Sequence, residues 1–256
     1  FEYGRYMKFT IAVFDADQGS CFDRMQPDLD NGVSIVHGMA PEVGECRSKT
    51  LEAMEHHCKT ANGVSKKTYK NRAGEPKKGG EVQGKGDNPA LWCLTSDKLL
   101  VGMDQMYPRM ALPSASGKED ITNTHFAFVD DVRTLQGSEE YGIQELQNVM
   151  VKLNVGAQKF SDVMDVTAAY TAFHKCETSL LGWKEYKGSL VVDYGTKYET
   201  ILGDSQGAAT KIKQRSPCEG PRALGFCQAL DGNTKPELRF RTGKIKKMFA
   251  AATSYT

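Results

Sequence analysis

Residues 9–23 read FTIAVFDADQGSCFD, and their first half predicts a buried strand that ends in carboxylates. The apolar residues at positions 9, 11 and 13 share a face with Asp15 and Asp17, because the side chains of a strand alternate with a period of two. A buried carboxylate without a partner is costly. Aspartates at the end of so apolar a strand therefore indicate a function.

A second acidic cluster lies far along the chain, in residues 126–132, which read FAFVDDV. Its aspartates, Asp130 and Asp131, again follow an apolar run. Carboxylates that meet from distant strands are typical ligands of Mg²⁺, which takes oxygen ligands and keeps positions open for phosphates. Asp17 and Asp130 are therefore predicted to share a magnesium site of the kind used in two-metal phosphoryl transfer, with Asp131 as an accessory.

The composition is that of a globular protein, with 256 residues, 39% hydrophobic and 25% charged. The net charge is only +1, but basic residues concentrate in residues 66–85 and 239–247. A locally basic channel on a nearly neutral protein is compatible with nucleic-acid binding. We expect the first basic segment to supply it, through Lys66, Lys67, Lys70 and Lys85.

The seven cysteines are scattered, and no two are spaced as CxxC. This usage predicts neither a disulfide framework nor a zinc site, and it favours a reducing, intracellular setting in nucleus or cytoplasm. No apolar stretch approaches 18 residues, so we expect no membrane as partner.

Hydrophobic periodicity and turn residues divide the chain into alternating helices and strands. We expect helices at 22–37, from 41 through 58, at 89–106, at 138–170 and at 236–256; strands at 9–17, around 130–131, at 189–193 and at 198–202; and loops or hairpins at 63–85 and 206–221. This order predicts an α+β fold, an antiparallel sheet backed by helices.

Four short motifs follow one another in the chain. Asp17 is followed five positions later by the aromatic Phe22, and residues 80–89 read GEVQGKGDNP, with Gln83 and Gly84 ahead of a helix. The third motif is FVDD at 128–131, and the fourth is a lysine, Lys175, soon after the long helix.

In this order the motifs resemble those of a reverse transcriptase palm, the core of RNA-directed DNA polymerases. Residues 222–233 resemble a thumb-proximal segment of reverse transcriptases from eukaryotic retroelements. The resemblance implies a polymerase palm over residues 1–205, with a fingers-proximal loop at 63–85, and a thumb-proximal segment at 206–256 that begins a helical thumb. The fingers would precede Phe1, so the chain resembles a fragment of a longer protein.

The resemblance also implies the partners and the roles of residues. Asp17, Asp130 and Asp131 would hold two Mg²⁺ ions, or Mn²⁺ as a substitute, and Lys175 would act as general acid for pyrophosphate. The partners would be an RNA template, a DNA primer and deoxynucleoside triphosphates.

The nucleotide-binding residues would be Phe22, Gln83 and Gly84. The bulk of Phe22 would exclude a 2′-hydroxyl group, and the glycine-rich loop would approach the nucleotide closely.

Two departures keep alternatives open. Val82 and Asn88 replace the proline and serine that the family usually carries in its second motif. A decayed, non-catalytic retroelement remnant that binds nucleic acid would show such changes. An RNA-dependent RNA polymerase shares the palm and the metal pair, but such enzymes generally carry glycine before the paired aspartates and a small residue in place of Phe22.

Overall fold

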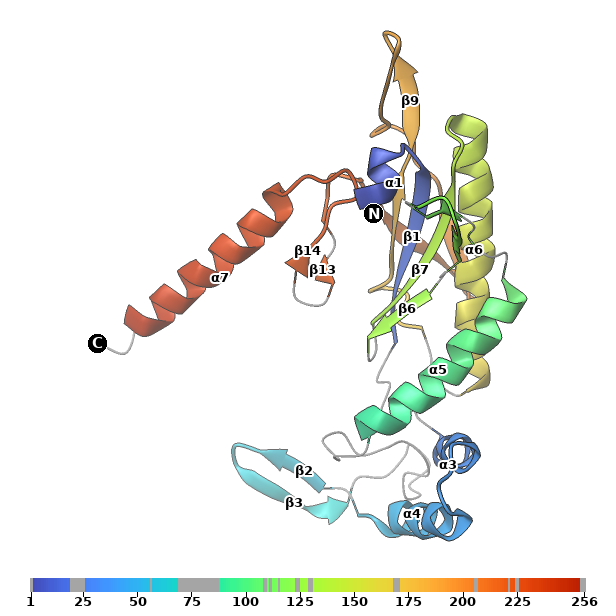
Figure 1. Cartoon of the computed structure of the whole chain (residues 1–256). Helices are drawn as coiled ribbons and strands as arrows, with labels where there is room; N and C mark the ends of the chain where they lie inside the picture. The colour runs from blue at the N-terminus through green and yellow to red at the C-terminus, as the bar shows by residue number, and fades with distance from the viewer. Residues whose placement is uncertain are drawn as a thin grey trace.

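The computed structural model describes residues 2–18, 26–55, 57–68, 88–107, 110, 112–114, 116–122, 125–128, 131–167, 171–204, 207–220, 222–223 and 226–253. The statements below concern these residues. They form an α+β fold, as predicted, built on one large sheet with a smaller helical lobe beneath it and a helix that extends to one side (Figure 1).

The sheet has six strands in the order β11-β12-β8-β1-β7-β6. Their bounds are β1 Thr10–Asp17, β6 His125–Phe128, β7 Asp131–Ser138, β8 Glu177–Leu181, β11 Thr200–Gly203 and β12 Ala209–Arg215. Neighbouring strands are antiparallel except β12 and β8, which are parallel. The sheet is therefore mixed. The expectation of a purely antiparallel sheet is wrong at this pair, because the chain between β8 and β12 returns β12 to the edge of β8 in the same direction.

Strand β1 lies in the middle and pairs with both β7 and β8. Its alternation divides its side chains between two faces. Ala12, Phe14 and Ala16 are buried toward α6 (Ile143–Val166), whereas Ile11 and Val13 belong to a second cluster on the opposite face. Because the alternation continues along the strand, Asp15 and Asp17 lie on the same face as Ile11 and Val13, opposite α6.

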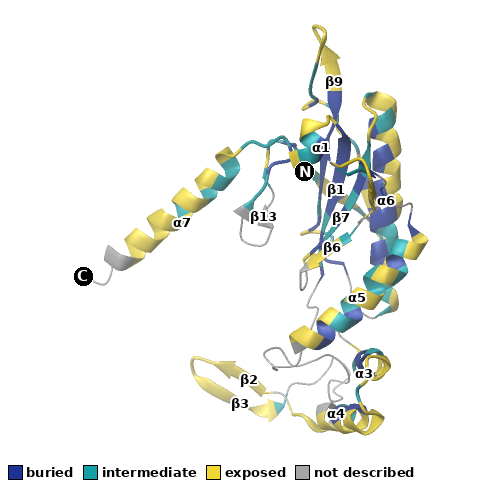
Figure 2. Ribbon diagram, viewed as in Figure 1, coloured by how far each residue is buried: buried dark blue, intermediate teal, exposed yellow. Residues whose placement is uncertain are grey.

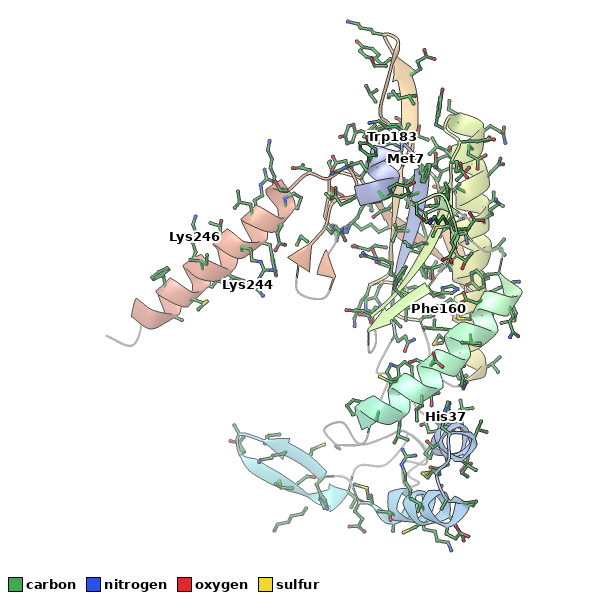
Figure 3. The ribbon with its side chains drawn as sticks, in the orientation of Figure 1. Met7, His37, Phe160, Trp183, Lys244 and Lys246 are labelled. Carbon is green, nitrogen blue, oxygen red and sulfur yellow. The ribbon has the colours of Figure 1, made fainter. Side chains whose placement is uncertain are left out.

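Helix α6 covers one face of the sheet, and its buried side is dark blue in Figure 2. Leu146, Leu153 and Phe160 recur every seven residues, the spacing of one helix face, and each is at most 1% exposed. The Phe160 ring (Figure 3) meets Phe14 edge to face, with centroids 6.4 Å apart. The helix was predicted from residue 138, but β7 continues to Ser138 and Gly142, with φ 107°, marks the boundary.

The other face of the sheet is covered only in part. Near the start of β1 it is packed by Trp183 and Leu230, by Tyr3 of α1 (Glu2–Tyr6) and by Leu112 of β4 (Leu112–Pro113), which pairs with β5 (Asp120–Ile121). Toward the end of β1 the same face carries charged side chains instead.

The helical lobe consists of α3 (Pro27–Val36), α4 (Pro41–Ala53) and α5 (Asn88–Met106), with a hairpin of β2 (His57–Thr60) and β3 (Gly63–Thr68). The helix expected to continue through residue 58 ends at Ala53, because His57 to Thr60 pair with β3. Buried polar contacts join the helices: Arg47 donates to Asn31 at 2.7 Å and Thr95 donates to Asp30 at 2.6 Å.

Residues 206–221, expected to be a loop, contain β12, a strand of the large sheet. The strand alternates Thr210, Ile212 and Gln214 with charged residues, and only Ile212 is strongly apolar, so its signal is weak. The predicted boundary at 205–206 falls between β11 and β12, two paired strands.

The remaining elements are the hairpin of β9 (Trp183–Tyr186) and β10 (Ser189–Val192), the short pair β13 (Arg222–Ala223) and β14 (Phe226–Cys227), and α7 (Lys235–Thr253). Helix α7 was predicted from residue 236 and extends away from the sheet (Figure 1).

Candidate functional site at the carboxyl end of strand β1

Two aspartates face each other where β1 ends and β7 begins. In the antiparallel register Asp17 is the direct partner of Asp131. Side chains of direct partners lie on the same face, with Cβ atoms about 4.5–5.5 Å apart. Like charges at such positions destabilise a sheet. The arrangement brings together two carboxylates that are far apart in the sequence, and it favours a cation beside them.

Lys175 lies beside this pair and supplies one such charge. Its Nζ is 3.0 Å from Oδ1 of Asp17. The segment that carries Lys175 is tied to the end of β1: Ala172 donates its backbone N–H to the carbonyl of Asp17 at 2.9 Å, and the backbone N–H of Lys175 donates to the carbonyl of Ala172 at 2.8 Å. The position of the lysine therefore follows from backbone contacts.

The buried side chain of Cys176 packs beneath the same segment. It is 1% exposed, and its Sγ lies 3.5 Å from the carbonyl oxygen of Ala172. Burial raises the pKa of the Cys176 thiol to about 11, and the charges of Asp17 and Asp15 add to that rise. The thiol therefore stays neutral and serves as packing, not as a nucleophile.

Asp15 and Arg133 form a second cross-strand pair, one step back along the same face. They are direct partners in the register, and Nε of Arg133 is 2.6 Å from Oδ1 of Asp15. Burial raises the pKa of Asp15 above its ordinary value, although Arg133 acts in the opposite direction. The guanidinium holds the charged carboxylate in place without engaging its buried Oδ2, which has no hydrogen-bond partner among the described residues.

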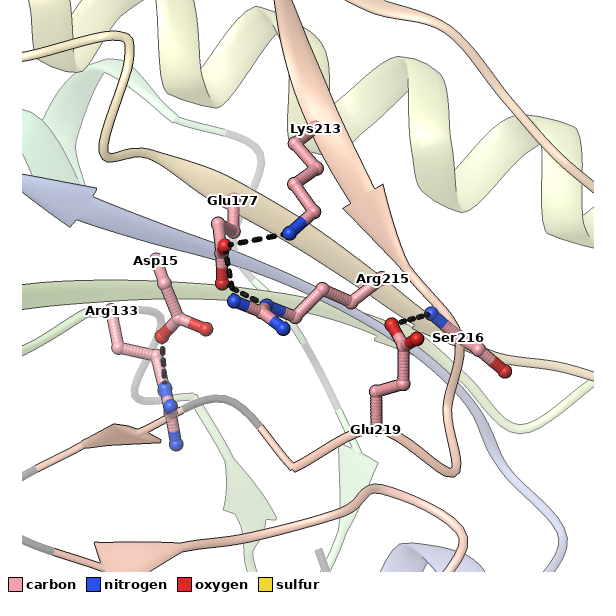
Figure 4. A network of polar contacts seen from close by, with 7 residues as sticks. All are labelled: Asp15, Arg133, Glu177, Lys213, Arg215, Ser216 and Glu219. Carbon is pink, nitrogen blue, oxygen red and sulfur yellow. Dashed lines mark hydrogen bonds and ion pairs between the residues drawn. The ribbon is translucent and has the colours of Figure 1, made fainter. Parts of the chain in front are cut away.

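The charges continue across the sheet as a row (Figure 4). Glu177 of β8 is the register partner of Asp15, and it pairs in turn with Arg215 and, at 3.6 Å, with Lys213 of β12. Glu219 accepts a hydrogen bond from the backbone N–H of residue 216 at 3.2 Å and lies near Arg215. Cations thus bracket the two adjacent carboxylates from both sides, which fixes the ends of four strands relative to one another.

The residues predicted to do chemistry divide into two groups. Asp17, Asp131 and Lys175 are brought together at one end of the sheet. Asp130, the first choice as second ligand, lies outside the described residues, as do Phe22, Gln83, Gly84, Lys70 and Lys85.

Lys66 and Lys67 are exposed on β3, in the hairpin of the helical lobe. They contact none of the three site residues through a described interaction. If these lysines bind nucleic acid, as predicted, the same molecule reaches the aspartates only if it is long enough to extend from the β2–β3 hairpin to the end of β1.

Sequence reasoning missed Arg133, Glu177 and Arg215. One signal was available: Arg133 follows Asp131 by two residues, as Asp15 precedes Asp17, so each pair shares a face of its strand. Only the strand register, however, shows that the pair on β1 lies opposite the pair on β7. The sequence likewise does not indicate that charged residues of β8 and β12 continue the same row.

Metal binding here would rest on the carboxylates of Asp17 and Asp131. Within the described ranges no group of three or more His, Cys, Asp or Glu side chains has the arrangement of a metal site. Two carboxylates directly opposite each other, with oxygen as the only ligand type, suit Mg²⁺ or Mn²⁺ better than a soft metal.

Among the described helices, none combines the length and the apolarity needed to cross a membrane. Comparison of the sequence with models of protein families and with curated proteins finds no match.

Proposed function

We propose that this chain is the palm of a reverse transcriptase of a eukaryotic retroelement and that it catalyses RNA-templated DNA synthesis by two-metal nucleotidyl transfer. One observation carries the proposal: Asp17, at the end of the central strand, is the register partner of Asp131, at the start of a hairpin strand. The two carboxylates come from distant segments, and Asp131 belongs to the FVDD motif, in which it was predicted as the accessory to Asp130.

The residues present fit a divalent cation. Asp17 and Asp131 would hold it, together with Asp130 as the sequence indicates, and the like-charge pair is relieved when a cation binds. Bound Mg²⁺, or Mn²⁺ in its place, supplies the positive charge that makes a primer 3′-hydroxyl more acidic and balances the charge of the triphosphate.

Lys175 would act as the proton donor. Its ammonium lies 3.0 Å from Oδ1 of Asp17, which supports this role because it would be close to a group bound at the aspartates. Transfer of its proton to the departing oxygen would complete the reaction. The hydrogen bonds that tie residues 172–175 to β1 hold it there before substrate arrives.

The Asp15–Arg133 pair would position the two aspartates. It lies next to them on the same two strands and fixes the β1–β7 register by a charged contact. A slip of one residue would turn Asp17 and Asp131 to opposite faces. The partners would be an RNA template, a DNA primer and deoxynucleoside triphosphates, in an intracellular setting.

The direct test is incorporation of deoxynucleotides on an RNA template with a DNA primer, in Mg²⁺ and in Mn²⁺. We expect Asp17→Asn and Asp131→Asn each to lower the rate at least about 100-fold, since a metal site supplies several kcal/mol. Asp97→Asn, on the exposed side of α5, is the matched control and should leave the rate unchanged.

Mn²⁺ binding, followed by electron paramagnetic resonance, provides a second readout. Incorporation that survives both site variants would refute the assignment of these carboxylates. Mn²⁺ binding lost in both variants, with no incorporation by the unaltered chain, would instead identify a non-catalytic remnant.

A further inference from the structure

One histidine is buried at the edge of the large sheet, although its neighbours there are exposed. Strand β6 is the last strand on its side of the described sheet, and its residues Phe126 and Ala127 are exposed. The side chain of His125, in the same strand, is only 1% exposed. A segment outside the sheet therefore covers it, and that segment is the end of α5.

The last turn of α5 and the residue after it form this cover. Nε2 of His125 lies 3.5 Å from Oδ1 of Asp104, and the Tyr107 ring meets the imidazole edge to face, with centroids 4.8 Å apart. The imidazole is also tied to the sheet, because its Nδ1 lies 3.0 Å from Oγ1 of Thr134 on β7. His125 thus lies between α5 and the hairpin of β6 and β7.

The contact between His125 and Asp104 is longer than a hydrogen bond. An N–H···O bond measures about 2.7–3.2 Å. Nε2 of His125 and Oδ1 of Asp104 are both buried, and neither has a hydrogen-bond partner among the described residues. The end of α5 is therefore held over the imidazole by packing, not by a hydrogen bond.

Contacts with α6 keep the end of α5 in place. The hydroxyl of Tyr107 accepts the backbone N–H of Phe160 at 3.1 Å, and Lys159 donates to the carbonyl of Met106. Burial, with a smaller contribution from Asp162, raises the pKa of Tyr107, so this hydroxyl stays neutral. Strand β6 has one neighbour among the described strands, so it is the element free to move away from α5.

The charge around the imidazole comes from Asp104. Lys159 and Asp162 of α6 lie toward Tyr107, and Arg133 of β7 faces the opposite side of the sheet. The carboxylate of Asp104 favours the protonated imidazole, but burial disfavours it more strongly and lowers the pKa of His125.

Protonation consequently favours any arrangement in which the imidazole meets water. With the cover closed, the pKa of His125 is below its ordinary value of about 6.5, and in a hydrated ring it returns to that value. The open state therefore binds a proton more readily than the closed one. The ratio of open to closed molecules should rise up to about 10-fold per pH unit as the pH falls from about 6.5 to the lowered pKa, and then level off.

The cover lies between the helical lobe and the candidate site. Helix α5 runs from the lobe, where it packs on α3, to the sheet, where Met103 and Tyr107 join the main core (Figure 1). His125 belongs to the hairpin whose second strand begins at Asp131, and it pairs in register with Thr134. A change at His125 is thus a change in the hairpin that carries an aspartate of the site.

We propose that the end of α5 is an acid-sensitive cover and that protonation of His125 separates β6 from it, which loosens the hairpin that carries Asp131. The effect on the aspartates rests on the proposed function, whereas the separation of β6 from α5 does not. Acid would then release this edge of the sheet before the sheet as a whole unfolds.

Hydrogen exchange of the full chain, followed by mass spectrometry, tests the separation. Protection factors, corrected for the intrinsic exchange rate at each pH, are compared at about pH 7.5 and about pH 5.5, on either side of the ordinary pKa of histidine. In peptides that cover residues 125–134, protection should fall on acidification by up to about 10-fold per pH unit. At both pH values it should be lower than in peptides of α6, which report opening of the core.

Three variants identify the group responsible. His125→Gln keeps a donor and an acceptor but does not titrate, so the acid-dependent loss of protection should disappear. His37→Gln, at an exposed histidine that follows α3 (Figure 3), is the matched control and should retain the loss. Asp104→Asn removes the charge that favours the protonated ring, so it should lower the pKa of His125 further and extend the loss to lower pH.

Two results would overturn the separation. One is protection in residues 125–134 equal to that of α6 at both pH values, because these residues would then open only with the whole protein. The other is an acid-dependent loss that His125→Gln leaves unchanged.

Mn²⁺ affinity, followed by electron paramagnetic resonance, tests the link to the aspartates. On acidification the unaltered chain should lose more affinity than His125→Gln, and equal losses would overturn the link. Mn²⁺ that binds at neither pH would overturn the assignment of the aspartates and this link with it, whereas the exchange result still decides the separation. Failure of the polymerase proposal and failure of the acid-sensitive cover are therefore distinguishable.

Discussion

The contact between Asp15 and Arg133 can be tested by replacing Arg133 with Met, which keeps much of the side-chain volume and removes the charge. The two side chains are 24% and 17% exposed, between a surface pair and a buried one. Exposed ion pairs contribute about 0–1 kcal/mol, whereas removal of one partner from a buried pair costs about 3–5 kcal/mol. We therefore expect Arg133→Met to lower the free energy of unfolding by about 2 kcal/mol at neutral pH.

The pH dependence of that loss identifies its cause. Burial already raises the pKa of Asp15 despite the opposing effect of Arg133, and removal of the guanidinium should raise this pKa further. The folded variant then binds a proton more tightly than the unfolded chain. Its stability should fall as the pH rises from about 3.9, the value for a free aspartate, through the raised pKa of Asp15. The destabilisation should accordingly shrink toward acid pH.

The assay is urea unfolding of a double-mutant cycle with Asp15→Asn, Arg133→Met and their combination. The combined variant should recover part of the loss, because it leaves no unpaired buried charge. The Glu45–Lys49 pair on α4, with both side chains exposed, is the control and should show a coupling energy below about 0.5 kcal/mol. A coupling as small as this between Asp15 and Arg133, or a loss independent of pH, would refute the reasoning.

Three further predictions concern packing and titration. Because burial raises the pKa of the Cys176 thiol to about 11, a thiol reagent at mild alkaline pH should modify it only when the chain unfolds; mass spectrometry that finds rapid labelling would contradict this. A Cβ at Gly156 would stand 2.4 Å from the Tyr107 ring, so Gly156→Ala should lower the free energy of unfolding by about 1–3 kcal/mol. Gly102 lies in a helix with open space around it, so Gly102→Ala should raise the free energy of unfolding by up to about 1 kcal/mol. Thermal melting that ranks the two variants the other way would exclude this packing. Burial lowers the pKa of His125, so unfolding free energy should decline as the pH falls below about 6.5 toward that lowered pKa, and His125→Phe should remove this part of the pH dependence in parallel urea titrations.

Much of the fold was predictable from local pattern. The alternation in residues 9–17 predicted β1, and the repeated apolar spacing in α5 and α6 predicted two buried helices, because local periodicity shows which face of an element is buried. The failures have physical reasons too. Strand β12 has one strongly apolar residue, Ile212, so its place in the sheet depends on neighbours and not on its own pattern. Strand β2 lies where the helix was expected to continue through residue 58; its hairpin with β3 is exposed except at the half-buried Ser65 and Thr68, so it carries little burial signal.

The sequence by itself determined which residues could do chemistry: aspartates at the end of an apolar strand, a second acidic pair, and a lysine after the long helix. Only the tertiary structure decided that Asp17 faces Asp131, and that Lys175 lies beside them. Only it revealed the charged row through Arg133 and Glu177. The reason is that residue type and period are local properties, whereas strand order and register arise from the packing of segments far apart in the chain.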